Sequence, residues 1–210
     1  ARGFLARAQA ELGEFEEGLA HGREALRIAE SIAHAYSVVV ACRSIATVLC
    51  LRGDLADARL WAERYLAIAQ EQDFSGLIPL ARVTLGRVHT LSGRISEAIA
   101  TLEQARIESG ARQHWGALLE GRVYLAEAYA LANRSEEARA ITADALRLVR
   151  ERRLRGVEAY ALRLLAELAA QADHPETEAA NARYDEALAL ATELGMRPLV
   201  AHCHLGLGKL

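Results

Sequence analysis

The chain has 210 residues, of which 52% are hydrophobic, 25% charged and 5% aromatic, and only three are proline. With 25 basic and 28 acidic side chains the formal charge is −3, so there is no overall positive field to hold a nucleic-acid backbone. Alanine and leucine are abundant and β-branched residues are scarce, which predicts helix throughout and excludes a large sheet.

The apolar runs and the cysteines indicate the cellular compartment of the protein. Wholly apolar stretches such as Val38–Cys42 are far shorter than the roughly 18 to 20 residues that span a bilayer, and no signal segment opens the chain. Three cysteines without a CxxC pair give neither a disulfide framework nor a zinc knuckle, which fits a reducing compartment. We therefore expect a cytoplasmic protein with no membrane and no nucleic-acid partner.

Small residues recur every 40 positions along the chain, and each follows an aliphatic residue. The series is Ala6, Ala46, Gly86, Ala126, Ala166 and Gly206. Seven residues later comes a turn former, in the series Gly13, Gly53, Gly93, Asn133 and Asp173. Glycine and asparagine at this point adopt the left-handed conformation that ends a helix.

Each unit is predicted to contain helix A, a tight turn, helix B and a connection to the next unit. Near-copies of one segment follow the turns: GEFEEG from Gly13, GDLADA from Gly53, GRISEA from Gly93 and NRSEEA from Asn133. The fifth reads DHPETEAANA from Asp173, as though some four residues were inserted before its helix B. The connections are expected near His34, Ser75, Gly110, Gly156 and Met196–Pro198. The predicted units are 1–33, 34–74, 75–110, 111–155, 156–196 and a half unit, 197–210.

The periodic small residues have a packing role, because two antiparallel helices approach closely only where a side chain is missing. One helix pair cannot bury its apolar stripe alone, so neighbouring pairs stack and share a core. The predicted fold is therefore all-α, a right-handed superhelical solenoid of antiparallel helix pairs.

The repeat pattern resembles a known family. The aliphatic and small residues, the turn glycine and the alanines Ala58, Ala98 and Ala138 resemble the tetratricopeptide repeat (TPR), with a period of 40 in place of 34. The longer unit is similar to repeats of bacterial signal-transducing ATPases, including LuxR-type regulators of the maltose-activator kind. The stretch ALALATELGMRPLVAHCHLGLGKL from Ala187 to Leu210 resembles the repeat region that follows the ATPase module in bacterial class III adenylate/guanylate cyclases.

Two departures from those relatives limit what the resemblance implies. The sequence has no GxxxxGK[ST] phosphate loop and no cyclase aspartate pair, so neither activity is expected in this chain. It begins without methionine inside an expected helix A and ends just after another, which predicts a piece of a longer polypeptide.

Candidate chemical groups favour structural roles. His202 and His204 flank Cys203, but residues two apart on a helix point roughly 200° away from each other and cannot share one metal. Cys42 and Cys50 lie on one helix face, too far apart for a disulfide, and are expected in the core. No nucleophile motif is present, so we expect no enzyme activity, no metal and no cofactor.

Other side chains have a packing or surface interpretation beside a binding one. The aromatic residues Trp61, Trp115, Tyr124 and Tyr129 are expected to pack in the helical framework. An arginine run could contact acidic protein, lipid headgroups or RNA, but it also closes a helix, where cations stabilise the C-terminal dipole. The run comprises Arg147, Arg150, Arg152, Arg153 and Arg155. We favour the solvated helix end.

The resemblance implies that the binding surface is a concave groove lined by helix A. The predicted groove residues are Arg43, Thr47, Val83, Arg87, Val123, Glu127, Arg163 and Glu167, with Tyr160 and Leu207 nearby. Asparagine is absent from these positions, so the family's carboxylate clamp is not matched. The arginines either bind an acidic or carboxylate-bearing partner or keep the groove soluble and pair with Glu127 and Glu167.

The expected function is a non-catalytic interaction scaffold, the sensor arm of a multidomain bacterial signalling ATPase, cyclase-linked or LuxR-type. Its partners would be a protein or peptide and other domains of the same polypeptide. The alternative is a sensor that closes on a small-molecule or peptide inducer. A third possibility is a free adaptor with no enzyme attached.

Overall fold

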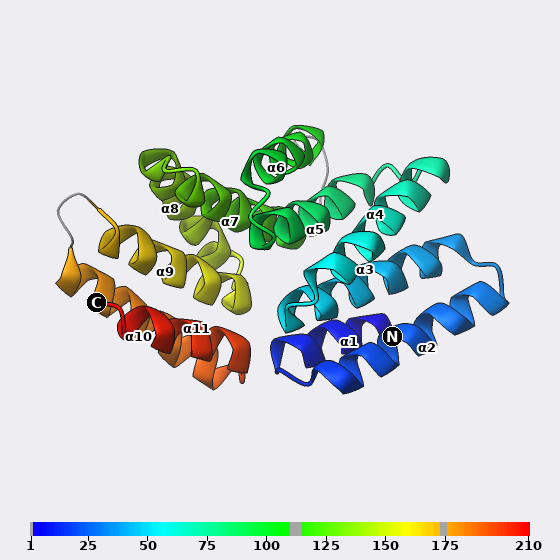
Figure 1. Cartoon of the computed structure of the whole chain (residues 1–210), viewed down its shortest axis with the longest axis horizontal. Coiled ribbons are helices and arrows are strands. Elements are labelled where there is room, and N and C mark those ends of the chain that lie inside the picture. The colour runs from blue at the N-terminus through cyan, green and yellow to red at the C-terminus, as the bar shows by residue number, and fades with distance from the viewer. Residues whose placement is uncertain (1, 110–114, 173–175) are drawn as a thin grey trace. The chain divides into compact units, whose positions relative to one another are not determined.

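The computed structural model describes residues 2–109, 115–172 and 176–210, and within these ranges it contains eleven α-helices and no strand (Figure 1). The helices fall into two compact units, Ala1–His114 and Trp115–Leu210, which we call unit 1 and unit 2. Unit 1 contains α1 (Arg2–Glu11), α2 (Phe15–Ser31), α3 (Ala35–Arg52), α4 (Leu55–Glu71), α5 (Ile78–Leu91) and α6 (Ile95–Ser109). Unit 2 contains α7 (Trp115–Leu131), α8 (Ser135–Glu151), α9 (Arg155–Ala170), α10 (Thr177–Glu193) and α11 (Arg197–Leu207).

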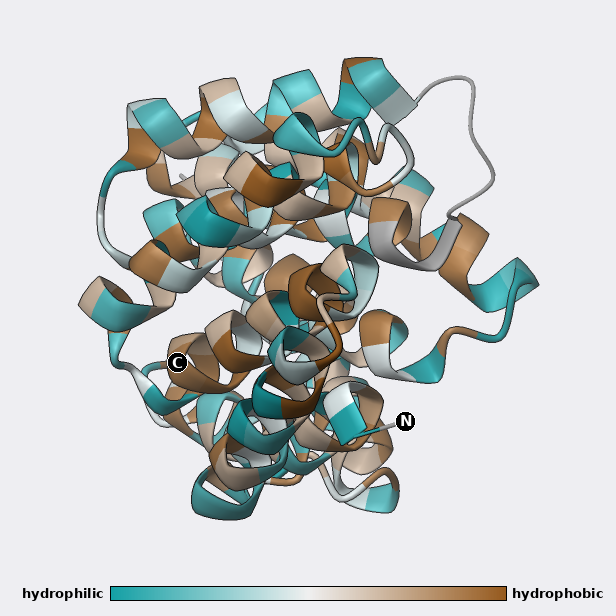
Figure 2. Ribbon diagram, turned by 90° about the vertical axis from the view of Figure 1, so that its right-hand side faces the viewer, coloured by the Kyte–Doolittle hydropathy of each residue, from teal (hydrophilic) through white to brown (hydrophobic). Residues whose placement is uncertain are grey.

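Odd-numbered and even-numbered helices play the two roles that the repeat predicts. In unit 1 each helix packs on the next along the chain, and the odd-numbered helices α1, α3 and α5 also stack on one another. In unit 2 the same holds for α7, α9 and α11. Several of the turns between helices are hydrophilic (Figure 2). The all-α solenoid of helix pairs is thereby confirmed.

The periodic small residues lie where helices touch. Ala6, Ala46, Ala126 and Ala166 are fully buried. At Gly206 the reason is visible, because a β-carbon added there would lie 2.3 Å from the Tyr184 ring of α10. Helices at this distance leave no room for a side chain.

The cysteines and most of the aromatic residues occupy the expected environments. Cys42, Cys50 and Cys203 are buried thiols, and Tyr124 and Tyr129 are buried as well. Trp61 is half-buried on α4, with the Arg64 guanidinium 5.2 Å from its ring centre. The side chain of Trp115 lies outside the described residues.

Left-handed residues at the turns form two series, of which the sequence shows one. Gly13, Gly53, Gly93 and Asn133 have positive φ between helix A and helix B, as predicted, while Asp173 lies outside the described residues. The second series lies between helix B and the next helix A, at Ala33, Asp73 and Arg153 and, two residues late, at Gly195. Residues of such different types give no recurring signal in the sequence.

The boundaries differ from the prediction at three places, one of which is the connection expected at Met196–Pro198, where Arg197 and Pro198 already lie in the first turn of α11. Gly156 was expected in a connection but lies in the first turn of α9, which begins at Arg155. Helices α2, α4, α6 and α8 begin at 40-residue intervals, and α10 begins two residues late at Thr177, where four inserted residues were expected. The expected connection at Gly110 lies outside the described residues.

One described helix is longer and more apolar than the sequence analysis allowed. By length and composition α3 could cross a membrane, since its 18 residues have a mean hydropathy of 1.5. Within the fold, however, 56% of this segment is buried, and α3 packs against α1, α2, α4 and α5. Burial in the centre of unit 1 accounts for its apolar composition.

Candidate functional site

The predicted groove residues all lie on odd-numbered helices, but they divide between the two units. Unit 1 contains Arg43 and Thr47 on α3 and Val83 and Arg87 on α5. Unit 2 contains Val123 and Glu127 on α7 and Tyr160, Arg163 and Glu167 on α9, with Leu207 on α11. The two sets differ in charge and in burial.

In unit 1 the set contains two arginines, a threonine and a buried valine. Arg43 and Arg87 are half-buried, and Val83 is only 3% exposed. The Thr47 hydroxyl donates to the Arg43 carbonyl oxygen at 2.9 Å, so its proton serves α3 itself. Half-buried guanidinium groups beside apolar side chains are screened less by salt than fully exposed ones.

A further arginine, Arg7 on α1, joins this set although the sequence analysis omitted it. Arg7 is half-buried, and its guanidinium lies 5.0 Å from the ring centre of Phe4. Burial raises the pKa of Tyr65 to about 12, while the positive charges of Arg43 and Arg7 act to lower it. Both arginines therefore act on one buried phenol. The signal was available, because Arg7, Thr47 and Arg87 are 40 residues apart.

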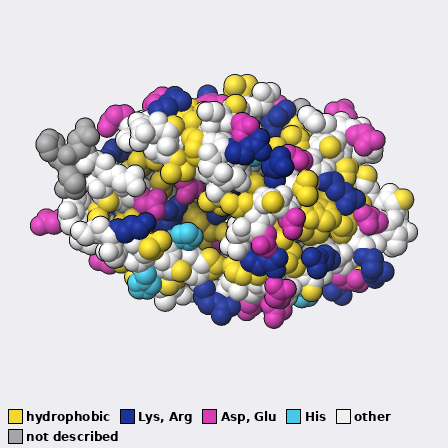
Figure 3. Space-filling model, viewed as in Figure 1, with side chains coloured by type: hydrophobic (Ala, Val, Ile, Leu, Met, Phe, Trp, Pro, Cys, Tyr) yellow, Lys and Arg dark blue, Asp and Glu magenta, His cyan; other side chains and the backbone are white. Residues whose placement is uncertain are grey.

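In unit 2 the predicted residues form a buried ion triad. Arg163 is 7% exposed, and its Nη2 donates to Glu127 Oε1 at 2.8 Å. Its Nη1 donates to Glu167 Oε1, one turn along α9. The triad joins α7 to α9 and has a formal charge of −1. Charged side chains of both signs lie over these helices on the face in Figure 3.

The protonation of the triad follows from its burial. Burial alone would lower the pKa of Arg163, but Glu127 and Glu167 raise it above its usual value. Burial raises the pKa of Glu167, although Arg163 acts in the opposite direction. Arg163 therefore stays charged, with its guanidinium bound by two carboxylates. The groove arginines had two interpretations, binding of a partner or pairing with Glu127 and Glu167. Arg163 follows the second.

The remaining predicted groove residues of unit 2 differ in burial. Val123 is 2% exposed and Tyr160 is 9% exposed, so both lie below the surface. Leu207 is half-buried near the end of α11.

The string His202-Cys203-His204 forms no metal site. Cys203 is fully buried in α11, while both histidines are exposed. Within the residues described, no group of three His, Cys, Asp or Glu side chains could hold a metal ion.

The arginine run of α8 and α9 is largely neutralised by carboxylates. Arg147 bonds Asp144 and Glu151, each at 2.8 Å. Arg150 bonds Glu158 at 2.7 Å, and Arg155 bonds Glu193 at 2.5 Å. These pairs support the solvated helix end over an anion-binding patch.

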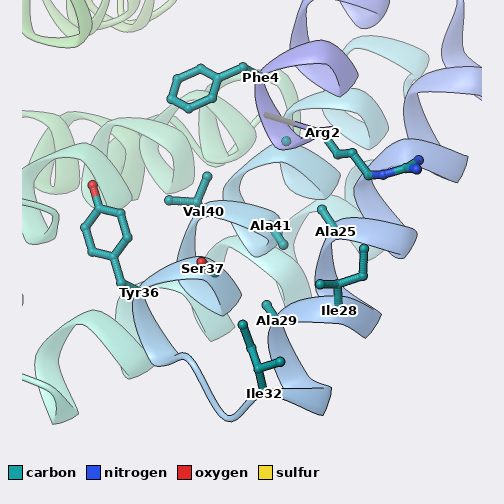
Figure 4. Close-up of a pocket in the computed structure, with 11 residues that line it drawn as sticks. Arg2, Phe4, Ala25, Ile28, Ala29, Ile32, Tyr36, Ser37, Val40 and Ala41 are labelled. Atoms are coloured by element: carbon teal, nitrogen blue, oxygen red, sulfur yellow. The ribbon is translucent and has the colours of Figure 1, made fainter.

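Unit 1 also contains a mainly apolar pocket of about 410 Å³ that the repeat pattern does not predict (Figure 4). It lies between α1, α2 and α3, and its lining includes Phe4, Ile28, Ile32, Tyr36 and Val40. Phe4 and Ile32 are more than 60% exposed, and the exposed Arg2 also lines the pocket. The lining residues are not related to one another by the 40-residue period, so the repeat pattern does not predict them.

Comparison with known proteins agrees with this architecture. Residues 1–24, 79–104 and 119–144 match the tetratricopeptide repeat family, and together they make up little more than a third of the chain. Among curated proteins none gives a significant match.

Solved structures share the fold at low sequence identity. A putative kinesin light chain with TPR-like repeats from Podosopora anserina is 19% identical with a TM-score of 0.61, covering 91% of this chain and 93% of that one. BtubC (BKLC) from P. vanneervenii is 19% identical with a TM-score of 0.67, covering 93% and 82%. The third is PH0952 from Pyrococcus horikoshii, a signal transduction ATPase with numerous domains (STAND) and a tetratricopeptide repeat sensor. It is 18% identical with a TM-score of 0.59, and the match covers 99% of this chain but 36% of that one.

The fold is thus that of a TPR-like helical-repeat solenoid. Such solenoids present extended surfaces formed by successive repeats, and these surfaces serve binding.

Proposed function

We propose that this chain is a non-catalytic scaffold that binds a carboxylate-bearing segment of a protein partner on unit 1. The observation that carries the proposal is the set formed by Arg7, Arg43 and Arg87 on the stacked helices α1, α3 and α5. Each is half-buried, and Val83 of α5 is buried.

The chemistry of recognition follows from the guanidinium group. Its planar fork donates two parallel hydrogen bonds to one carboxylate, which gives directional as well as electrostatic selectivity. Three such groups on adjacent helices suit an extended acidic segment rather than a single ion.

A peptide-binding measurement tests this proposal. The probe is a fluorescent polyglutamate peptide, with a polyglutamine peptide of equal length for comparison. We expect wild-type protein to bind polyglutamate with an affinity that falls as salt rises. The triple variant Arg7→Ala, Arg43→Ala, Arg87→Ala should bind at least about tenfold more weakly, since charged hydrogen bonds contribute about 1.5 to 3 kcal/mol each.

A matched control removes the same charge elsewhere in unit 1. Arg23, Arg59 and Arg106 lie on the even-numbered helices α2, α4 and α6, and their alanine triple variant also lowers the net charge by three. It should keep wild-type affinity within about twofold, which is well under 1 kcal/mol. If both triple variants lost the same affinity for polyglutamate, net charge alone would attract the peptide. The proposed arginine site would then be wrong.

The wider role that we propose is the sensor arm of a multidomain bacterial signalling ATPase, cyclase-linked or LuxR-type. The fold match to a STAND protein with a tetratricopeptide repeat sensor supports it, as does the C-terminal resemblance at Ala187–Leu210. The other domains of such a polypeptide would be further partners, and the location would be cytoplasmic. The same triple variant, placed in the whole signalling protein, should fold and fail to signal.

A second candidate function is an inducer-binding sensor, and the pocket between α1, α2 and α3 favours it. Its volume of about 410 Å³ lies within the range of small-molecule sites. A ligand at a hundred times its Kd would stabilise the chain by about 2.7 kcal/mol. Thermal denaturation against a panel of apolar compounds tests this, and Ala25→Phe, which narrows the pocket, should abolish any stabilisation.

A further inference from the structure

His89 of α5 is a buried imidazole that the proposed binding function does not use. It is 8% exposed, and both Nδ1 and Nε2 are shielded from solvent. Neither nitrogen has a hydrogen-bond partner among the described residues. A buried polar group without a partner is costly, and a buried charge in the same place would be far more so.

The repeat shows that the fold does not need a histidine at this position. The residue 40 positions earlier is Leu49 on α3, which is 3% exposed. An aliphatic side chain therefore fills the equivalent space in the preceding helix pair. The histidine adds a group that changes charge near neutral pH, where leucine would only pack.

Two ion pairs face His89, and they determine what would happen to a protonated ring. Arg94 and Glu97, at the start of α6, bind each other, and Arg59 and Glu63 of α4 are paired at 3.3 Å. Both carboxylates would attract an imidazolium ion, but each is already bound by an arginine that repels it.

The other packed elements do not reverse this balance. On α3, which also packs against α5, the last residue is Arg52, and its guanidinium is bound by Asp54 and Glu16. The C-terminal end of α5 favours a cation there, yet burial is the largest influence, and together with Arg94 it lowers the pKa of His89 below its usual value of 6.5. The neutral ring is therefore the form that fits the fold.

We propose that His89 makes unit 1 sensitive to acid: with a neutral ring α5 packs against α4 and α6, and protonation of the ring loosens this packing. In the unfolded chain the histidine titrates near 6.5, whereas in the folded chain it titrates lower. Between these two values the unfolded chain binds more protons, so stability falls as the pH falls through this window. Above pH 6.5 the stabilising contribution is fully present. Because α5 contributes Val83 and Arg87, acid would also weaken the surface that we propose for binding.

Native-state hydrogen exchange at pH 7.5 and 5.5, corrected for intrinsic exchange rates, tests the proposal on the whole chain. In wild-type protein the protection of α5 and α6 should fall by up to about tenfold at pH 5.5, the limit for one group that titrates near 6.5 when unfolded. In His89→Leu, which copies Leu49, this fall should disappear. The matched control His204→Leu removes an exposed histidine from α11 and should behave as wild type.

A second measurement needs no variant. NMR titration of the wild-type imidazole should give a midpoint below 6.5 for His89. A midpoint at or above 6.5 would overturn the proposal, as would an equal fall in protection in wild type and His89→Leu. Neither result depends on whether unit 1 binds an acidic partner.

Discussion

Gly86 of α5 lies so close to Leu102 of α6 that a β-carbon at position 86 would be 2.4 Å from Leu102 Cγ. At the same repeat positions of the preceding helix pair the residues are Ala46 and Ala62, both fully buried. The large side chain on helix B is therefore accommodated by loss of the side chain on helix A. The two positions change together because they share one space.

The first prediction concerns this shared space. Gly86→Ala should destabilise unit 1 by about 1 to 3 kcal/mol, because it overpacks against Leu102. Leu102→Ala alone should cost about 2 to 5 kcal/mol by leaving a cavity. The double variant copies Ala46 and Ala62, so urea unfolding should show a total cost at least about 1 kcal/mol below the sum. Additivity within about 0.5 kcal/mol would show that the two positions are not coupled.

This relationship also shows how far the sequence predicts the fold. The 40-residue series of small residues and turn formers was sufficient to predict an all-α solenoid, since both reflect backbone constraints that few residue types satisfy. The second series of turns was missed, because Ala33 and Arg153 adopt a left-handed conformation that their residue types do not favour, and Asp73 alone makes no recurring pattern. Nor could the sequence divide the chain into two compact units, which depends on contacts between distant residues.

The second prediction concerns backbone conformation at the turns. Ala33 has φ of 50°, and Gly53 has φ of 98° with nothing within 4 Å of an added β-carbon. Ala33→Gly should therefore raise stability by about 0.5 to 1 kcal/mol, and Gly53→Ala should lower it by about 1 to 2 kcal/mol. Urea midpoints of the two variants check both signs. Because Gly53 has open space around it, a loss there measures conformation and not a steric clash.

The third prediction concerns the thiols. Burial raises the pKa of Cys42 to about 11, although Arg64 acts to lower it, so at pH 8 about one such thiol in a thousand is ionised. Burial also raises the pKa of Cys203. Folded protein should therefore react very slowly with a disulfide reagent at pH 8, and urea should release three reactive thiols. The variant Ser31→Cys, at an exposed position of α2, provides the positive control. Prompt reaction of the native thiols would contradict their burial.

The candidate site was less accessible to sequence analysis than the fold. Helix A positions could be assigned from the repeat, which placed Arg43 and Arg163 at one repeat position and Arg87 at another, all on the expected groove face. Their environments differ for a reason outside the repeat: Glu127 lies 36 residues before Arg163, one unit earlier, and bonds it across α7 and α9. An ion pair between adjacent units follows from how two helices stack, and periodicity alone does not specify it.

The fourth prediction concerns this buried triad. Removal of Arg163 leaves the carboxylates of Glu127 and Glu167 without their shared cation, so Arg163→Leu should destabilise unit 2. Breaking a buried ion pair costs about 3 to 5 kcal/mol, and we expect the lower value because the Glu167 side chain is 31% exposed. Arg155→Leu, at an exposed pair on the same helix, should cost no more than about 1 kcal/mol.

The pH dependence of Arg163→Leu separates lost charge pairing from lost packing. Burial already holds the pKa of Glu167 above its usual value, and removal of the arginine takes away the influence that lowers it. A carboxyl group with a raised pKa in the fold binds its proton more tightly there than in the unfolded chain. Stability of the variant should therefore rise as the pH falls toward the unfolded pKa of about 4.3.

A second variant combines Arg163→Leu with Glu127→Gln and Glu167→Gln. It should regain most of the stability lost at pH 7, as measured by urea unfolding. A loss that is the same at pH 5 and pH 7, and that the glutamines do not relieve, would assign Arg163 a packing role through its aliphatic stem.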